Sequence, residues 1–148
     1  MLKFKIVLLF AFIFCLESNG QEIKFGKVTK AELLESSYAK DSSANAAYLY
    51  RNRRSFYRYS KGSGVELVTE IHERIKIYEK DGFPYATKIV NLYKSGTTKE
   101  SMSGLKGFSY ALVDDKIVET KLQKENIFKS EYSKNLSQVK LTMPNIKE

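Results

Sequence analysis

The chain has 148 residues, of which 43% are hydrophobic and 28% charged, and a formal net charge of +8. This length suits one ordinary domain, and the positive charge is compatible either with an anionic partner or with a solvated, lysine-rich surface. The only cysteine is Cys15 and the only histidine is His72, which argues against a disulfide framework, a cysteine nucleophile and a Cys/His zinc site in the body of the chain.

The N-terminus has the pattern of a secretory signal peptide. Two lysines precede an apolar run over residues 6–16, and small residues follow it before Gln21. The run is much shorter than the roughly 20 residues that a membrane-spanning helix needs. We therefore expect a signal peptide over residues 1–20 and an exported chain over residues 21–148, either periplasmic or extracellular. An uncleaved N-terminal anchor is the alternative.

Cys15 does not suit lipid attachment, because the bulky Phe14 precedes it where a small residue is needed. Cleavage before Gln21 would remove Cys15 together with two lysines and one glutamate, leaving a net charge of about +7. The exported chain would then lack cysteine and would be held together by its own core.

The first regular element expected is a short helix. Thr29 and Glu32 have the spacing of a capping box, in which each residue's side chain accepts a hydrogen bond from the other's backbone N–H. This spacing predicts a one- or two-turn helix over residues 30–36, followed by a polar loop over residues 40–46.

The rest of the chain alternates between apolar and polar residues with a period of two, which is typical of β-strands. The strands expected from this pattern cover residues 46–51, 55–60, 65–79, 85–93, 105–113, 116–122 and 136–144. Segment 123–135 is charged and irregular, with at most a short strand at residues 127–128. The predicted fold class is mainly β: antiparallel sandwich-like sheets with one short N-terminal helix, incomplete at the C-terminus.

Turn residues separate these strands. Asn52–Arg54 is expected to form a hairpin turn, residues 80–84 a turn around a central Asp-Gly pair, and Asp114–Asp115 a second hairpin turn. Strand 65–79 shows the clearest alternation, and its apolar stripe is expected to be buried. The members of the stripe are Val65, Leu67, Thr69, Ile71, Ile75 and Ile77.

The sequence contains no catalytic constellation that we can identify. His72 lies between Glu70 and Arg74 on the polar face of its strand and is expected to be exposed, without an orienting partner or nucleophile. A hairpin turn explains Asp114–Asp115 more simply than a cation site does. We therefore predict no catalytic residue, no metal site, no cofactor and no enzymatic activity for this segment. A carboxylate-based hydrolase remains an alternative, since paired glutamates cannot be recognised from one sequence.

The clearest binding feature is the segment over residues 48–60, which interleaves tyrosine and phenylalanine with arginine. Aromatic rings can stack on sugars or bases, and arginine binds carboxylate or phosphate with two hydrogen bonds. The candidate binding residues are Arg51, Arg53, Arg54, Tyr57 and Arg58. The alternative is a hairpin whose aromatic rings pack inward while its arginines remain solvated. Nucleic acid is not expected as a ligand for an exported protein.

Five segments, taken in order, resemble an uncharacterised domain-of-unknown-function family at the N-terminus of exported transglutaminase-like proteins, chiefly of Bacteroidetes. They span most of residues 21–148 and read "IKFGKVTKAEL", "YAKDSSANAAYLY", "ELVTEIHERIKIYEKDGFPYA", "SGLKGFSYALVDDKIVETKLQKENIFKSEYSKN" and "VKLTMPNIKE". The resemblance implies a β-rich module that continues into further strands and a papain-like transglutaminase domain with a Cys-His-Asp triad. Because the sequence ends at Glu148, residues 21–148 are expected to be a partial N-terminal domain.

We therefore expect a non-catalytic exported β-module that precedes a transglutaminase-like domain and has a scaffold or partner- or glycan-binding role. The expected partners are the downstream domain of the same full-length chain and envelope glycan or protein, with no transmembrane span after signal cleavage. The alternative is an independent small basic secreted protein that binds anionic glycan or envelope components.

Overall fold

The computed structural model describes residues 23–146, so the predicted signal peptide over residues 1–20 lies outside the described residues. The described chain is mainly β, with antiparallel sheets and one short N-terminal helix, and this confirms the predicted mainly β fold class. The incompleteness at the C-terminus stays a prediction. The elements in chain order are α2 (Lys30–Leu34), β1 (Ala46–Ser60), β2 (Gly64–Ile77), the 3-10 helix η1 (Lys80–Ala86), β3 (Thr87–Ser95), β4 (Thr98–Lys99), β5 (Phe108–Val113), β6 (Lys116–Lys121), the 3-10 helix η2 (Lys124–Asn126), β7 (Ile127–Ser133) and β8 (Leu136–Thr142).

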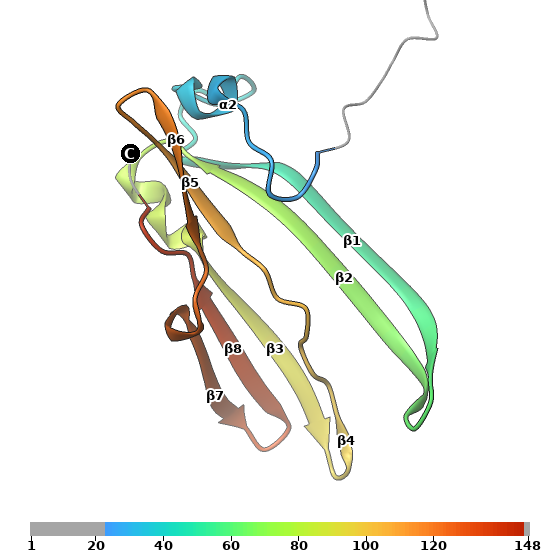
Figure 1. The fold of residues 1–148 in the computed structure, drawn as a ribbon. Helices are drawn as coiled ribbons and strands as arrows, with labels where there is room; N and C mark the ends of the chain where they lie inside the picture. The colour runs from blue at the N-terminus through green and yellow to red at the C-terminus, as the bar shows by residue number, and fades with distance from the viewer. Residues whose placement is uncertain (1–22, 147–148) are drawn as a thin grey trace, which may run out of the picture.

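The strands form three separate antiparallel sheets: the hairpin β1–β2, the four-stranded sheet β4-β3-β8-β7 and the hairpin β5–β6. In Figure 1 the β1–β2 hairpin and the four-stranded sheet start from the region of η1 and diverge toward their tips. The β5–β6 hairpin and α2 lie at the end where the two layers meet. No helix among the described residues is long and apolar enough to cross a membrane.

The capping box of α2 is present as predicted. The backbone N–H of Thr29 donates to Glu32 Oε2 at 2.8 Å, and the backbone N–H of Glu32 donates to Thr29 Oγ1 at 3.2 Å. These two bonds satisfy backbone donors that would otherwise lack partners at the start of the helix. A helix this short gains little from propensity alone, so its caps and tertiary contacts hold it.

The hairpin turn predicted at Asn52–Arg54 is wrong. Residues 46–60 form one continuous strand, in which Asn52 lies opposite His72 and Arg54 lies opposite Glu70 of β2. The chain reverses instead between β1 and β2, where Gly62 and Gly64 have φ values of 112° and 76°. Glycine adopts such positive φ angles at little cost, whereas Asn52–Arg54 contains no glycine to favour a reversal.

Two other segments differ from the sequence-based expectation. Residues 127–133 form strand β7 rather than an irregular segment, because pairing with β8 supplies the backbone hydrogen bonds that the local pattern does not indicate. Residues 80–86 form the 3-10 helix η1 rather than a simple turn. Gly82 packs so closely that a Cβ atom there would lie 2.3 Å from the Asn45 carbonyl oxygen.

The β5–β6 hairpin turns at Asp114–Asp115 as predicted. Their φ angles of 47° and 64° are both positive, as the favoured two-residue hairpin turn requires. Ser109 of β5 is buried, and its hydroxyl lies 2.5 Å from the carbonyl oxygen of Pro144, which follows β8. This contact ties the hairpin to the end of the four-stranded sheet.

The buried core is small and centres on β8. Val139 is 2% exposed and Leu141 is 8% exposed. Leu122, just after β6, is also buried and lies against Gly107. A Cβ atom at Gly107 would lie 3.2 Å from side-chain atoms of both Leu122 and Met143. The core therefore lies where the β5–β6 hairpin meets the four-stranded sheet, away from the tip of the β1–β2 hairpin.

The prediction that the apolar stripe of strand 65–79 is buried is wrong for its outer half. Val65 is 70% exposed, Leu67 65% and Ile71 51%. Farther along the strand, Ile75 and Ile77 are half-buried. The periodicity located the strand correctly, but it does not indicate whether another layer covers the apolar face.

Candidate binding surface on the β1–β2 hairpin

The structure divides the five predicted binding residues between the two faces of the β1–β2 hairpin. Residues opposite each other in an antiparallel pair lie on the same face, and successive residues alternate between faces. Arg51, Arg53 and Tyr57 therefore lie on one face, whereas Arg54 and Arg58 lie on the other. The five residues do not form the single surface that the sequence suggested.

The face that holds Tyr57 is also the exposed apolar face of the hairpin. Tyr57 lies opposite Leu67, and Tyr59 lies opposite Val65. Both tyrosines are 76% exposed. We call this surface the open face, defined by the five residues Tyr57, Tyr59, Val65, Leu67 and Ile71.

Arginine side chains flank the open face toward the middle of the hairpin. Arg53 lies opposite Ile71, is exposed and forms no ion pair with any residue of the described chain. Arg51 lies opposite Glu73, and its Nε is 3.0 Å from Glu73 Oε1. The open face is thus bordered by one guanidinium whose charge no described neighbour neutralises.

The arginines on the opposite face already have partners within the hairpin. Arg58 donates a hydrogen bond of 2.9 Å to Glu66, and this bond, together with one from Ser63, holds the pKa of the Glu66 carboxyl below its usual value of 4.5. The guanidinium of Arg54 lies 5.1 Å from the centre of the Phe56 ring. These contacts suit a solvated structural role rather than a ligand site.

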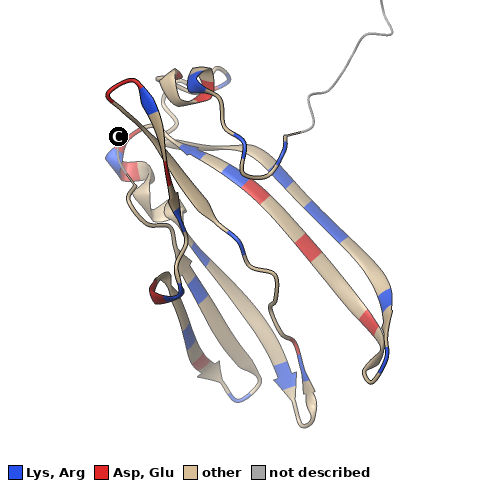
Figure 2. Cartoon of the chain, in the orientation of Figure 1, with Lys and Arg blue, Asp and Glu red and all other residues tan. Residues whose placement is uncertain are grey.

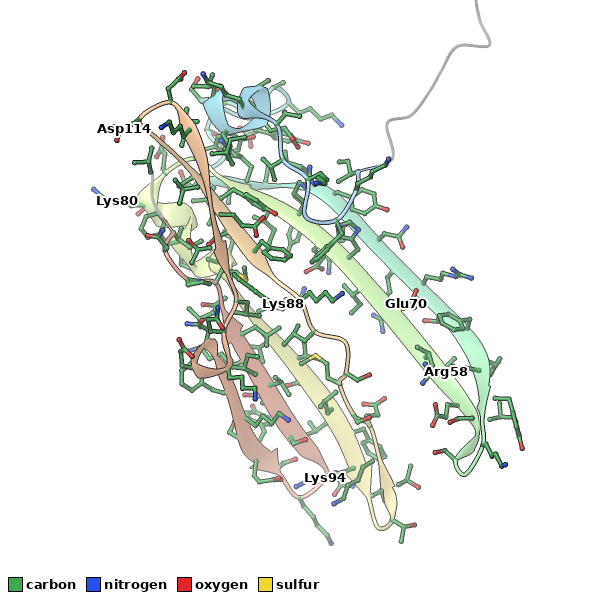
Figure 3. All side chains as sticks on the ribbon, in the orientation of Figure 1. Arg58, Glu70, Lys80, Lys88, Lys94 and Asp114 are labelled. Atoms are coloured by element: carbon green, nitrogen blue, oxygen red, sulfur yellow. The ribbon has the colours of Figure 1, made fainter. Side chains whose placement is uncertain are left out.

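The open face continues into the junction between the hairpin and the four-stranded sheet. The ammonium group of Lys88 in β3 donates to both carboxylate oxygens of Glu73, at 2.8 and 2.7 Å. Figure 3 shows Lys88 extending from β3 toward β2. Glu73 is on the same face as Ile71 and Leu67, so the apolar stripe runs outward from the point where β2 contacts β3.

His72 is not the exposed strand histidine that the sequence suggested. It is half-buried on the face opposite the open face, with its ring 5.2 Å from that of Phe25 and 4.8 Å from that of Tyr50. Phe25 also packs on Phe108 of β5, at 5.7 Å. Histidine here belongs to an aromatic cluster that joins the N-terminal segment to β2 and β5, an arrangement that depends on contacts far apart in sequence.

Arg74 anchors the N-terminal segment to the same face. Its Nη1 donates to Glu32 Oε1 at 2.7 Å, and its Nη2 donates to the carbonyl oxygens of Lys24, at 2.9 Å, and Lys27. Burial acts to raise the pKa of the Glu32 carboxyl, but the hydrogen bonds from Thr29 and Arg74 outweigh it and hold that pKa below 4.5. Residues 24–32 therefore cover this face around His72 and Arg74, while the open face has no such cover among the described residues.

Metal-binding potential is limited in the described chain. Residues 23–146 contain no group of three or more His, Cys, Asp or Glu side chains arranged to hold a metal ion. The side chains of the open face are apolar or phenolic and arginines flank them, so the interactions available there are packing, stacking and hydrogen bonding to carboxylate.

A comparison of the chain with protein-family models, with curated proteins and with solved structures found no match.

Proposed function

We propose that this chain is a non-catalytic binding module of an exported protein, and that the open face of the β1–β2 hairpin receives a protein partner. One observation carries the proposal: five large apolar side chains share one face of the hairpin, and each is 51% to 76% exposed. The hydroxyl pair Ser55–Thr69 separates Ile71 from the other four. Clustered exposed apolar side chains of this kind mark interaction sites on soluble proteins.

The composition of the open face indicates the chemistry of the partner. Tyrosine is enriched at protein interfaces because its ring packs while its hydroxyl remains hydrogen-bonded. Val65, Leu67 and Ile71 offer only apolar contact, and the unpaired Arg53 beside Ile71 favours a carboxylate at the rim. The matching surface is therefore an apolar patch of a protein with an acidic residue at its edge.

The resemblance to the N-terminal domain of exported transglutaminase-like proteins suggests where this partner comes from. On that basis we propose that it is a domain of the same full-length protein, which the module orients or shields. The exported location, in the periplasm or outside the cell, belongs to the same proposal and is supported by the signal-peptide pattern over residues 1–20.

An anionic glycan is the second candidate ligand, and one observation favours it. Tyr57 and Arg53 lie on the same face of β1, so an aromatic platform and an unpaired guanidinium are presented together. A sugar ring can stack on a phenol ring, and a uronic-acid carboxylate can bind a guanidinium. The three aliphatic residues of the open face have no role in this version, and this distinguishes it from the protein partner.

Site-specific photo-crosslinking of the full chain in the producing cell tests the proposal. A benzoylphenylalanine replaces Tyr57 on the open face or, as the matched control, Arg54 on the opposite face. We expect a discrete crosslink from position 57 to the partner domain within the same full-length protein, which disappears when Leu67→Asp is added, and none from position 54. Equal adducts from both positions would contradict the assignment of the open face. The glycan would be favoured if position 57 gave no crosslink and the chain instead bound a uronic-acid oligosaccharide with an affinity that depends on Arg53.

A further inference from the structure

A second surface feature lies at the far tip of the four-stranded sheet, separate from the open face. A pocket of about 310 Å3 is lined by Lys94, Ser95, Gly96, Lys99, Lys134 and Asn135. These residues come from the β3–β4 turn and the β7–β8 turn, which lie side by side because β3 and β7 both pair with β8. Figure 2 shows basic positions in both turn regions at this end of the sheet.

The three lysines of the pocket are placed unfavourably with respect to one another. Lys94 and Lys99 lie directly opposite each other in the β3–β4 pair, and like charges in that position destabilise a sheet. Lys134 adds a third ammonium group from the neighbouring turn. A sequence that gathers three cations around one concave site gains from an anion that occupies it.

Neighbouring carboxylates neutralise only part of this charge. Lys94 forms an ion pair with Glu131 of β7. Glu100 is directed elsewhere, since its Oε2 accepts a hydrogen bond of 2.7 Å from the backbone N–H of Tyr93. Lys99 and Lys134 form no ion pair within the part of the chain that the structure describes. Two ammonium groups therefore remain available to a ligand.

The pocket also offers neutral hydrogen-bond donors of the kind that bind oxyanions. Ser95 and Asn135, which carry a hydroxyl and a side-chain amide, line it together with the lysines. The backbone N–H of Lys94 donates to the Asn135 carbonyl oxygen at 2.9 Å, which fixes the two turns relative to each other. The volume of the pocket lies at the lower end of the range of small-ligand sites and is large enough for a phosphorylated or sulfated sugar.

We propose that this pocket binds a tetrahedral oxyanion, a phosphate or sulfate ester group, through Lys99 and Lys134 with Lys94 in support. The group is either carried by a soluble ligand or exposed as a lipid headgroup at a membrane surface. The proposal is independent of the open face, because no residue of the pocket belongs to the β1–β2 hairpin.

Titration of the full exported chain with inorganic phosphate or inorganic sulfate at low ionic strength, followed by amide NMR, tests the site. The amide resonances of Gly96 and Asn135 should shift saturably. The double variant Lys99→Gln, Lys134→Gln should weaken binding by about tenfold or more, a change of about 1.4 kcal/mol. The matched control Lys116→Gln, Lys121→Gln removes the same charge from β6 and should leave the affinity within about twofold.

A third variant separates ligand binding from mere structural support. Glu131→Gln removes the carboxylate that competes for Lys94, so it should bind phosphate more tightly than the unmodified chain. Vesicles of phosphatidylglycerol in phosphatidylcholine, tested with the same variants, distinguish a lipid headgroup from a soluble ester. The proposal would be overturned if the pocket variant and the β6 variant lost the same affinity for phosphate, or if none of these probes gave a saturable shift.

Discussion

Lys88 of β3 and Glu73 of β2 form a two-pronged contact, with the Lys88 ammonium 2.7 Å and 2.8 Å from the two Glu73 carboxylate oxygens. This contact joins two sheets that share no backbone hydrogen bonds. The Glu73 side chain is only 13% exposed, and Arg51 contacts it from the neighbouring strand. The pair therefore helps to hold the β1–β2 hairpin, and with it the open face, in place relative to the four-stranded sheet.

Replacing Glu73 with glutamine should lower the free energy of unfolding by about 1–3 kcal/mol. The substitution removes the charge that both Lys88 and Arg51 use, and it leaves two cations close together without a counter-charge. Chemical denaturation followed by circular dichroism measures the effect. Glu70→Gln on the opposite face is the control, since Glu70 is exposed, and it should change stability by less than about 0.5 kcal/mol. Equal effects of the two variants would contradict the structural role of the pair.

Gly82→Ala should destabilise the protein by about 2 kcal/mol or more. The added Cβ would lie 2.3 Å from the Asn45 carbonyl oxygen, so η1 would have to move away from the segment before β1. The same oxygen accepts backbone hydrogen bonds from Tyr78, at 2.9 Å, and Glu79, at 3.3 Å, and these would be strained as well. Thermal unfolding provides the measurement.

Gly107→Ala provides the comparison for Gly82→Ala. Its nearest neighbours are side-chain atoms of Leu122 and Met143 at 3.2 Å, which can shift by a few tenths of an ångström. We therefore expect a smaller loss of stability than for Gly82→Ala. A larger loss at Gly107 would show that the contact between η1 and Asn45 is not the tighter of the two.

Acid should release the N-terminal segment before the rest of the chain unfolds. The pKa of Glu32 is held below 4.5 in the folded chain, so its hydrogen bonds to Thr29 and Arg74 stabilise the fold at neutral pH. Because the folded pKa is depressed, this contribution is present above the unfolded pKa and is lost as the pH falls through the folded pKa. Hydrogen exchange of residues 24–35 between neutral and acidic pH should show the loss of protection.

The variant Glu32→Gln should abolish most of this acid dependence, because glutamine does not titrate in this range. Protection of residues 24–35 in the variant should already be reduced at neutral pH, since the ion pair with Arg74 is missing. An unchanged acid response in Glu32→Gln would mean that another carboxylate controls the docking of this segment.

Two tyrosines should titrate well above the usual tyrosine pKa of about 10. Burial, followed by the nearby Glu35 carboxylate, raises the pKa of Tyr78 to about 12. Burial likewise raises the pKa of Tyr110 to about 12, and the nearby Glu119 carboxylate contributes to this shift. The Tyr110 hydroxyl has no partner with hydrogen-bond geometry among the described residues. Ultraviolet difference spectroscopy should show a late phase that decreases in Tyr78→Phe and in Tyr110→Phe.

The sign of the linked stability follows from these raised values. The folded chain favours the neutral phenol, so the contribution of each tyrosine is present below its unfolded pKa and is lost as the pH rises through about 12. Stability should therefore fall between pH of about 10 and pH of about 12. A titration in which all tyrosines ionise near pH 10 would contradict the burial of these two hydroxyls.

Local sequence signals predicted the parts of the fold that depend on neighbouring residues. Thr29 and Glu32 form their capping box, and Asp114–Asp115 turns its hairpin, because each requires only a few consecutive residues. The strand over residues 65–79 was also located closely, at Gly64–Ile77, because alternation is a property of the strand itself.

Features that depend on distant contacts could not be predicted in this way. The β1 strand continues through Asn52–Arg54 because β2 pairs with all of it, and β7 exists because β8 lies beside it. His72 is half-buried because Phe25 packs against it from the N-terminal segment, far away in the sequence. The open face was missed for a similar reason: Val65 and Leu67 alternate as buried residues do, and only the arrangement of layers shows that they are uncovered.

The predicted site residues illustrate the same limit. The interleaved arginine and tyrosine of residues 48–60 indicated a binding surface, but the period of two places alternate residues on opposite faces. Only Tyr57 belongs to the open face, with Arg51 and Arg53 beside it on the same side of the hairpin, while the remaining arginines pair with Glu66 or lie on Phe56. Once β1 is known to be one continuous strand, the alternation of its residues assigns these side chains to two different faces.

The most direct test of the central claim is the dissociation constant between this 148-residue chain and the domain that crosslinks to position 57, produced as a separate protein. The proposal predicts that Tyr57→Ser with Leu67→Ser weakens binding by at least about tenfold, because both side chains lie on the open face. The control Arg54→Gln with Glu70→Gln alters the opposite face and should leave the constant within about twofold. Equal weakening by the two pairs, or none by the first, would contradict the claim.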